Sequence, residues 1–290
     1  MNAMQTTTVT LTGTGVPLPS PGRAGAGVLV KHNDTILQFD AGRGTVIRLA
    51  ECGIAPHQLS AVFLTHVHSD HVMDLADVVL TRWIQQTLHP TSPIEIVCPI
   101  GAPEQFVNRM LDAFDIDIDL RIKHVQETPP RFSVSPFEAT GNPKTVWESP
   151  DGTVSVLAIA VHHEPVPDAV AYRVNTPNGS AVISGDTRVC DEVEEFTRGA
   201  QILIHEACRI RAMGQSIKGS KFEKIFDYHA DTVALGELAK RAEVPHLVLT
   251  HLIPQPRNEQ DRDSFISDIR SGGFTGKVTV GSDLDSFEID

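Results

Sequence analysis

Short apolar runs alternate with stretches of helical spacing along the whole chain. Apolar positions three and four residues apart predict helices that end near Glu51 and that cover Val72–Leu88, Pro103–Phe114 and Ala230–Ala242. Runs rich in β-branched and apolar residues, bounded by Gly, Pro or Asp, predict strands at Val9–Leu11, Gly27–Val30, Thr35–Phe39, Ala61–Leu64, Ile94–Val97, Val154–Val161, Ala169–Val174, Ser180–Ser184, Ile202–Ile204 and His246–Thr250. Because strands and helices alternate without a clear linker, we expect one layered α/β domain over residues 1–290.

One segment departs from this alternation. Thr128–Gly152 is rich in Pro, Ser and Thr, and its composition predicts a loop-rich insertion at about residues 128–152. Such an insertion forms a lid over a site or decorates an edge of the fold, and the sequence leaves both roles open.

Composition narrows the class of protein and the partners to expect. The chain has 41% hydrophobic and 21% charged residues, which is typical of a soluble globular protein. Its net charge of −13 argues against a broad basic surface for nucleic acid, so we expect a small-molecule substrate. The four cysteines form no CxxC pair, no leader pattern follows Met1, and no apolar run is long enough to span a membrane. These features predict a cytoplasmic protein without membrane association.

A dense group of potential metal ligands follows the fourth predicted strand, in the sequence Ala61-Val-Phe-Leu-Thr-His-Val-His-Ser-Asp-His71. His66 and His68 are two residues apart in an extended segment, so their side chains point the same way. Asp70 and His71 fall where the chain enters a helix, where consecutive residues diverge. The segment therefore predicts ligands for two metals, and mixed imidazole and carboxylate donors suit Zn²⁺ or a similar first-row ion.

Three other predicted strands also end in ligand-type residues. Ser155–Val161 runs into His162 and His163, of which either could point toward the metals. Asp186 follows the strand that ends at Ser184, and its carboxylate could bridge two cations. His251 ends the sequence Leu249-Thr-His, which repeats the Leu64-Thr-His of the first group. A single histidine at a strand end is usually structural, but four strand ends that carry ligand types together favour a metal site.

These motifs resemble those of the metallo-β-lactamase superfamily. Its HxHxDH signature is present at His66–His71, and further matches are Phe39-Asp-Ala-Gly42, Ser184-Gly-Asp-Thr187, Leu203-Ile-His-Glu-Ala207 and Tyr228-His-Ala-Asp-Thr232. The chain is most similar to the branch that contains ribonuclease Z, arylsulfatases and phosphodiesterases. The resemblance implies a four-layer αβ/βα sandwich, two divalent cations (zinc first, with manganese or iron as alternatives) and a possible homodimer.

The resemblance also implies roles for individual residues. The two cations would be held by seven side chains: His66, His68 and His163 on the first, Asp70, His71 and His251 on the second, and Asp186 between them. His163 is favoured over His162 because its offset to Tyr172 fits the arylsulfatase-like form of the motif. His229 would act near the scissile bond, oriented by Glu206, and Asp70 would orient the attacking water. Asp40 is expected to orient one of the ligand histidines.

Taken together, these features predict a binuclear metal-dependent hydrolase, in which a metal-bridging hydroxide attacks a small-molecule ester. The preferred substrate class is a phosphodiester, an aryl sulfate or an aryl phosphate. The alternatives are a tRNA 3′-processing endoribonuclease like ribonuclease Z, a lactonase or β-lactamase, and a hydrolytic dehalogenase. A non-catalytic, metal-stabilised binding protein is the alternative from another class. Where the resemblance implies a long basic arm that grips tRNA, the chain has only the tight hairpin Val174–Ser184, which favours the small-molecule substrate.

Overall fold

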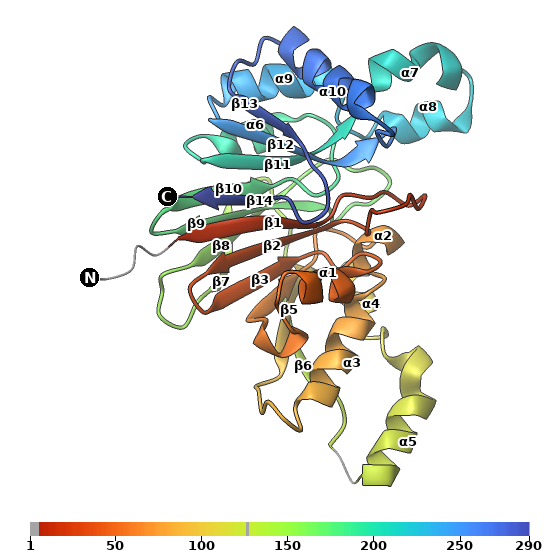
Figure 1. The fold of residues 1–290 in the computed structure, drawn as a ribbon, viewed down its shortest axis with the longest axis vertical. Helices are drawn as coiled ribbons and strands as arrows, with labels where there is room; N and C mark the ends of the chain where they lie inside the picture. Colours follow the sequence, from red (N-terminus) through yellow and green to blue (C-terminus); the bar gives the residue numbers. More distant parts are fainter. Residues whose placement is uncertain (1–5, 126–127, 290) are drawn as a thin grey trace.

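Two mixed β-sheets pack face to face, with helices on both outer surfaces (Figure 1). The computed structural model describes residues 6–125 and 128–289; residues 1–5, on which the prediction of no leader rests, lie outside this range. The predicted four-layer αβ/βα sandwich is confirmed. Among the described residues, no helix is long and apolar enough to cross a membrane.

The first sheet carries the N-terminal half of the chain and its last strand. Its strands lie in the order β14-β1-β2-β3-β4-β5-β6. Their bounds are β1 (Thr7–Gly13), β2 (Gly27–His32), β3 (Thr35–Phe39), β4 (Ala61–Phe63), β5 (Ile94–Pro99), β6 (Phe132–Phe137) and β14 (Ser286–Ile289). The outer face is covered by helices α1 (Thr45–Glu51), α2 (Ser69–Val72), α3 (Leu75–Gln85) and α4 (Ala102–Val107), with short 3₁₀ turns at Pro56–Gln58 and Asp112–Phe114 and the exposed helix α5 (Asp115–Val125) beyond them.

The second sheet has the order β13-β12-β11-β10-β9-β8-β7. Its strands are β7 (Lys144–Glu148), β8 (Ser155–Ala160), β9 (Val170–Thr176), β10 (Gly179–Ile183), β11 (Ile202–Cys208), β12 (His246–Ile253) and β13 (Lys277–Val280). Its helices are α6 (Asp191–Thr197), α7 (Ile210–Ile217), α8 (Lys221–Phe226), α9 (Thr232–Arg241) and α10 (Glu259–Ser271). Since β8, β10, β11 and β12 run in the same direction, their carboxyl ends meet at one edge of the sheet.

Three apolar clusters hold the layers together, one between the sheets and one under the helices of each outer layer. The central cluster includes Phe39 and Phe63, whose rings stack 4.7 Å apart. Tyr172 crosses from the second sheet to the first, and its hydroxyl donates a hydrogen bond to the Leu64 carbonyl at 2.6 Å. Tyr172 thus fixes the carboxyl end of β4 against the opposite sheet, just before His66.

Residues 128–152, which the sequence predicts as a loop-rich insertion, include two strands and the loops around them. The segment contains β6 and β7, which form the outer strands of the two sheets. Both are edge strands that mix polar with apolar residues and leave most side chains at least partly exposed, and β6 contains Pro136, which an edge strand tolerates. The predicted helix Val72–Leu88 corresponds mainly to α3, since α2 ends at Val72. The predicted helix Pro103–Phe114 is interrupted after Val107, where α4 ends.

Candidate metal centre and hydrolytic site

The carboxyl ends of strands from both sheets meet at one place. The segment His66–His71 follows β4 of the first sheet, and its helical part is the short α2. The second sheet supplies the remaining side chains of the predicted set, which are His163 after β8, Asp186 after β10, Glu206 within β11 and His251 within β12. All of these side chains are buried except His68, which is partly exposed. The two Leu-Thr-His sequences therefore reach the same site from opposite sheets.

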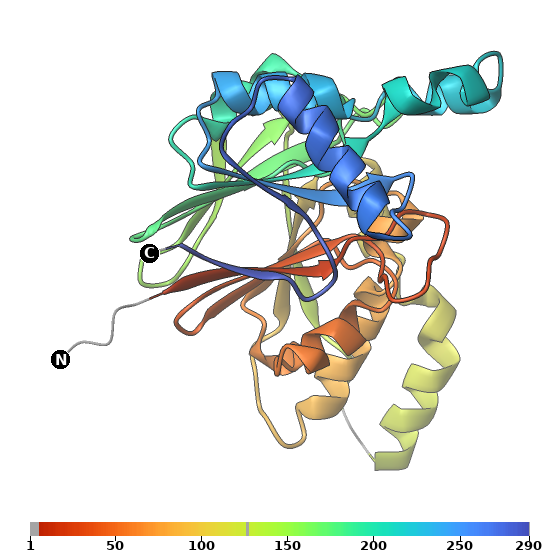
Figure 2. The ribbon, with the colours of Figure 1, turned by 45° about the horizontal axis from the view of Figure 1, so that its top comes forward.

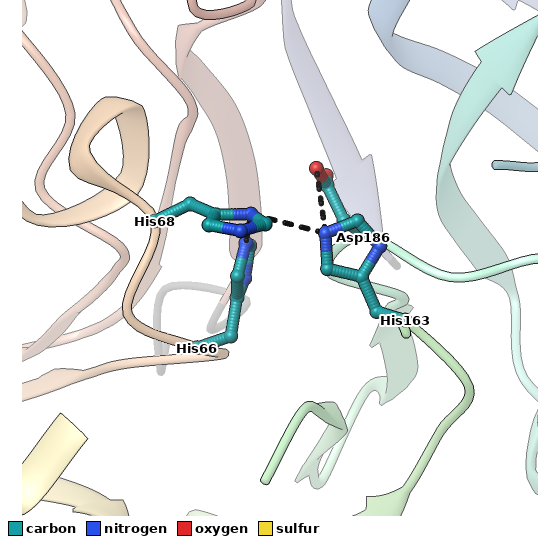
Figure 3. Close-up of side chains that lie close together, drawn as sticks. All are labelled: His66, His68, His163 and Asp186. Carbon is teal, nitrogen blue, oxygen red and sulfur yellow. Dashed lines mark hydrogen bonds and ion pairs between the residues drawn. The ribbon is translucent and has the colours of Figure 1, made fainter. Parts of the chain in front are cut away.

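Three imidazoles and a carboxylate form the first group (Figure 3). His68 Nδ1 lies 3.0 Å from His66 Nε2 and 3.1 Å from His163 Nε2. The carboxylate of Asp186 completes the group, with Oδ2 at 3.8 Å from His163 Nε2.

A second group, Asp70, His71 and His251, lies on the other side of Asp186. His251 Nε2 is 3.2 Å from Asp70 Oδ2 and 3.4 Å from Asp186 Oδ2. His71 Nε2 is 3.4 Å from Asp186 Oδ1. The carboxylate of Asp186 thus faces both groups, as a bridging ligand must.

The polar atoms of these groups are arranged to coordinate a pair of divalent cations rather than to form hydrogen bonds with one another. His68 Nδ1 lies about 3 Å from a ring nitrogen of both His66 and His163, and a tetrahedral zinc site places its nitrogen ligands about 3.3 Å apart. His71 Nε2 is buried and makes no hydrogen bond. Buried polar atoms without partners are costly, and cations at these positions would satisfy them. The residues present therefore suit the divalent metals that the sequence predicts.

Asp40 orients His71, as predicted. Its Oδ2 accepts a 2.7 Å hydrogen bond from His71 Nδ1, which leaves Nε2 directed at Asp186 and Asp70. Thr65 fixes Asp40 in turn, because its backbone N–H and its hydroxyl donate to the carboxylate at 2.8 and 2.7 Å. The Thr65 hydroxyl also lies 3.0 Å from His66 Nδ1. Thr65 was not among the predicted site residues, although its position directly before His66 was a usable signal.

The backbone at the site is held in uncommon conformations. Asp40 and His251 have φ angles of 54° and 43°, in the left-handed region that non-glycine residues seldom adopt. Gly185, next to Asp186, also has a positive φ of 59°, and a Cβ there would lie 2.8 Å from the Thr65 Cβ. The turn that presents Asp186 therefore packs directly on the strand end that presents His66.

Burial and mutual charge decide the protonation of these groups. Burial, together with the charge of His71, lowers the pKa of His66 well below its usual value, which favours the neutral imidazole that binds metals. Burial also lowers the pKa of His163. Burial opposes the ionised form of Asp186, but the nearby charges of His251 and His71 outweigh it and lower the pKa of Asp186 well below its usual value. Neutral His66 and His163 with an ionised Asp186 are the forms that coordinate cations. His71 differs, because the charges of Asp186 and Asp40 outweigh its burial and raise its pKa well above the usual value.

His229 and Glu206 form a separate pair beside the metal-ligand groups. His229 Nδ1 lies 2.9 Å from both carboxylate oxygens of Glu206, and its ring is 5.3 Å from that of His163. Burial lowers the pKa of His229, but the charge and hydrogen bond of Glu206 outweigh it and raise the pKa to about 9. Glu206 also accepts hydrogen bonds from the backbone N–H groups of Thr187 and Ala230, so its carboxylate orients His229.

Of the two adjacent histidines, His163 faces the groups and His162 does not. His162 is partly exposed, and its Nε2 lies 3.2 Å from Glu192 on α6. The structure thus brings together every side chain of the predicted set, and it places the alternative His162 on the opposite side of the strand end.

Comparison with known proteins defines the class. The sequence profile described as "Beta-lactamase superfamily domain" matches residues 37–252. The structure of YhfI from Bacillus subtilis, a metallo-β-lactamase fold protein, superposes with a TM-score of 0.74 over 98% of this chain and 99% of that one, at 20% identity. The short form of human tRNase Z gives a TM-score of 0.71 at 22% identity, covering 98% and 99% of the two chains. These structures share the fold of this chain.

Curated sequences are more similar still. The chain is 35% identical over 271 residues to ribonuclease Z of Mycolicibacterium gilvum, covering 92% of this chain and 91% of that protein. Ribonuclease Z of Mycobacterium bovis is also 35% identical over 271 residues, covering 92% of both chains. The chain therefore belongs to the metallo-β-lactamase superfamily, in its ribonuclease Z branch, and it is a metal-dependent hydrolase.

The prediction that nucleic acid is an improbable partner conflicts with these relatives. It rested on the net charge of −13, which is a sum over the whole chain. A sum does not describe the local field at one edge of the fold, where bound cations and clustered lysines can reverse the sign.

Proposed function

We propose that the protein is an endoribonuclease that removes the 3′ extension of precursor tRNA. The proposal is carried by the match to proteins named ribonuclease Z over 92% of the chain. The arrangement of donor groups supports it, since seven side chains suited to two cations lie beside a histidine that can donate a proton. We further propose that the seven side chains are the metal ligands named above, with Asp186 shared.

The residues around the scissile phosphodiester have distinct tasks in this proposal. When bound, a pair of divalent cations would lower the pKa of the attacking water and neutralise charge on the phosphoryl oxygens. Asp70, buried and 3.2 Å from His251, accepts a proton from the attacking water as the new P–O bond forms. His229 uses Nδ1 to bind Glu206, so Nε2 remains to donate a proton to the leaving oxygen as the old P–O bond breaks.

The test compares two substrates on purified protein whose metal content has been measured. We expect a precursor tRNA with a 3′ trailer to be cut once, near the 3′ end of the mature sequence, and Asp70→Ala to abolish the cut. An intact precursor together with rapid hydrolysis of bis-p-nitrophenyl phosphate would overturn the proposal.

A small-molecule ester remains the second candidate, because one observation favours it. β9 and β10 are joined by a tight turn at Pro177 and Asn178, so no arm projects between Arg173 and Gly185. A protein without that arm needs another surface to hold a structured RNA, or it acts on a smaller phosphodiester.

A further inference from the structure

A helical hairpin projects from the fold next to the candidate active site. It consists of α7 and α8, residues Ile210–Phe226, and the two helices pack mainly on each other. Figure 2 shows this hairpin, in teal, extending beyond the helices that cover the second sheet. In the chain it is inserted between Glu206 and His229, the pair that lies beside the metal-ligand groups.

Both ends of the hairpin are fixed to the site. The Cys208 N–H donates to the Ala230 carbonyl at 2.7 Å, and the Arg209 N–H donates to the Ile253 carbonyl at 2.8 Å. Arg209 also pairs with Asp268 at 2.7 Å, and Arg211 pairs with Asp231 at 3.1 Å. The base of the hairpin is therefore held in place next to His229 and β12, which carry candidate active-site groups.

The hairpin is basic in an acidic protein. Residues 209–228 contain five basic and two acidic side chains, a net charge of +3, whereas the whole chain carries −13. Lys218, Lys221 and Lys224 are exposed, and within residues 6–125 and 128–289 none of them has an ion-pair partner. Glu223 is occupied, because it accepts a hydrogen bond from the Gly219 N–H at 2.8 Å. Three unneutralised ammonium groups thus lie at the tip of the hairpin and along α8.

An aromatic side chain lies among these lysines. Phe222, between Lys221 and Glu223, is 50% exposed, and its ring stacks on that of Phe226 at 6.0 Å. An exposed ring supported from behind is a platform on which an unpaired base can stack, and lysines beside it bind the flanking phosphates.

We propose that the α7–α8 hairpin is an RNA-binding element that holds the substrate backbone while the scissile bond lies at His229. This inference rests on the proposed function, since it names the surface that grips the RNA. It also answers the difficulty of the tight β9–β10 turn, because a basic projection is present at a different place in the chain. Lys218, Lys221 and Lys224 bind phosphates, and Phe222 stacks on a base.

The experiment reverses the charge of the hairpin and of a matched surface. The test variant is K218E/K221E/K224E, and the control variant is K31E/K240E/K277E. The control lysines are exposed, have no ion-pair partner among the described residues, and lie at the opposite end of the strands and helices from the site. Both variants lower the net charge by 6, from −13 to −19, so long-range repulsion of RNA changes equally.

Two quantities are measured, the KM for a precursor tRNA and the dependence of RNA affinity on salt. In the hairpin variant, we expect KM to rise about tenfold or more and the slope of log affinity against log salt to fall by about 2 to 3, since each lost phosphate contact removes about 0.7 to 0.9. The ratio of kcat/KM for RNA to that for bis-p-nitrophenyl phosphate should fall by the same factor. Phe222→Ala should raise KM about fivefold or more without changing the slope.

The outcomes separate this inference from the proposed function. Equal KM values and equal salt slopes in the two triple variants would overturn the hairpin as the RNA-binding element, even if RNA is cleaved. If the unaltered protein binds RNA through the hairpin but cleaves only bis-p-nitrophenyl phosphate, the proposed function fails and the hairpin inference stands. A protein that neither binds nor cleaves RNA overturns both.

Discussion

The chemistry of the site depends on which nitrogen of each histidine is free. Partners on Nδ1 determine this for three of them. Asp40 holds Nδ1 of His71, so Nε2 faces the carboxylates, and Glu206 holds Nδ1 of His229, so Nε2 remains for the substrate. His163 Nδ1 lies 3.4 Å from the Tyr228 carbonyl, which leaves its Nε2 for the first group. The neighbouring acceptors therefore determine which ring nitrogen of each buried histidine is free for a metal or for the substrate.

The two adjacent histidines give a matched test of the proposed ligands. We expect His163→Ala to lower the bound metal from about two to about one per chain, because a three-histidine group loses a member. His162→Ala should keep both metals and most activity, since the side chain of His162 pairs with Glu192 on α6 and faces away from both groups. Metal analysis by mass spectrometry, with activity on a phosphodiester, measures both effects. Equal metal loss in the two variants would contradict the assignment of His163.

His229 should titrate well above an ordinary histidine in the metal-free protein. Its pKa is raised to about 9, so the ring is protonated at neutral pH and loses its proton as pH rises through about 9. NMR titration of the imidazole checks this value. Replacing Glu206 with Gln removes the charge that raises the pKa, so the midpoint should fall by at least one pH unit. A midpoint that stays near 9 in Glu206→Gln would show that another group sets it.

The same pair should govern the chemical step. We expect His229→Ala to lower kcat about 10²- to 10⁴-fold, the usual contribution of a positioned proton donor, and to leave the metal content unchanged. The loss should be smallest for substrates with good leaving groups, which need no proton. A uniform loss for good and poor leaving groups would argue that His229 binds the substrate instead.

At the scale of elements, the strand ends explain both what the sequence could predict and what it could not. Buried strands such as β4, β10 and β12 are short apolar runs, so their positions and the ligands after them were visible. The edge strands β6 and β7 were missed because they are only partly buried and mix polar with apolar residues, including Pro136 in β6, without a clear strand pattern. Helices α6, α8 and α10 were missed because about half of their residues are charged and their apolar stripes are narrow, and α7 was missed because it is short and contains Gly214.

The orientation of the side chains at the site could not be predicted from the spacing of residues in the sequence. The positive φ angles of Asp40 and His251 depend on contacts between strands that are distant in the sequence. Thr65 shows the same limit, since its role is to connect Asp40 with His66 across two neighbouring strands. The residue types of the site could be predicted, but the tertiary contacts that aim them could not.

Gly185 offers a test of how tightly the two strand ends are joined. Gly185→Ala adds a Cβ that would lie 2.8 Å from Thr65 and also forces a left-handed φ of 59° on alanine. Gly199→Ala is the control, because its φ is 74° but nothing lies within 4 Å of the added Cβ. We expect the free energy of unfolding to fall by about 1 kcal/mol in the control and by about 2 to 4 kcal/mol in Gly185→Ala. Only Gly185→Ala should also weaken metal binding, as measured by chelator competition.

For the whole molecule, cations bound at the site would add to its stability by binding the native arrangement of buried ligands. Two of the proposed ligands, Asp70 and Asp186, are each at most 4% exposed. We expect chelation to lower the melting temperature by about 5 to 10 °C, and a zinc excess of about 100-fold over its Kd to restore it, a gain of about 2.7 kcal/mol. Thermal melts in chelator and in zinc measure the difference. An unchanged melting temperature in a protein that binds two cations would contradict this expectation.

The division of the donors between the sheets has one more consequence. The chain passes from the first sheet to the second through the exposed link between β6 and β7, around Gly141 and Asn142. A break in that link would leave His66 to His71 on one fragment and the other donors, together with the returning strand β14, on its counterpart. Neither piece could capture a cation pair alone, so tight zinc uptake would reappear only when the fragments reassociate. Zinc binding would therefore measure directly whether the two fragments have reassociated.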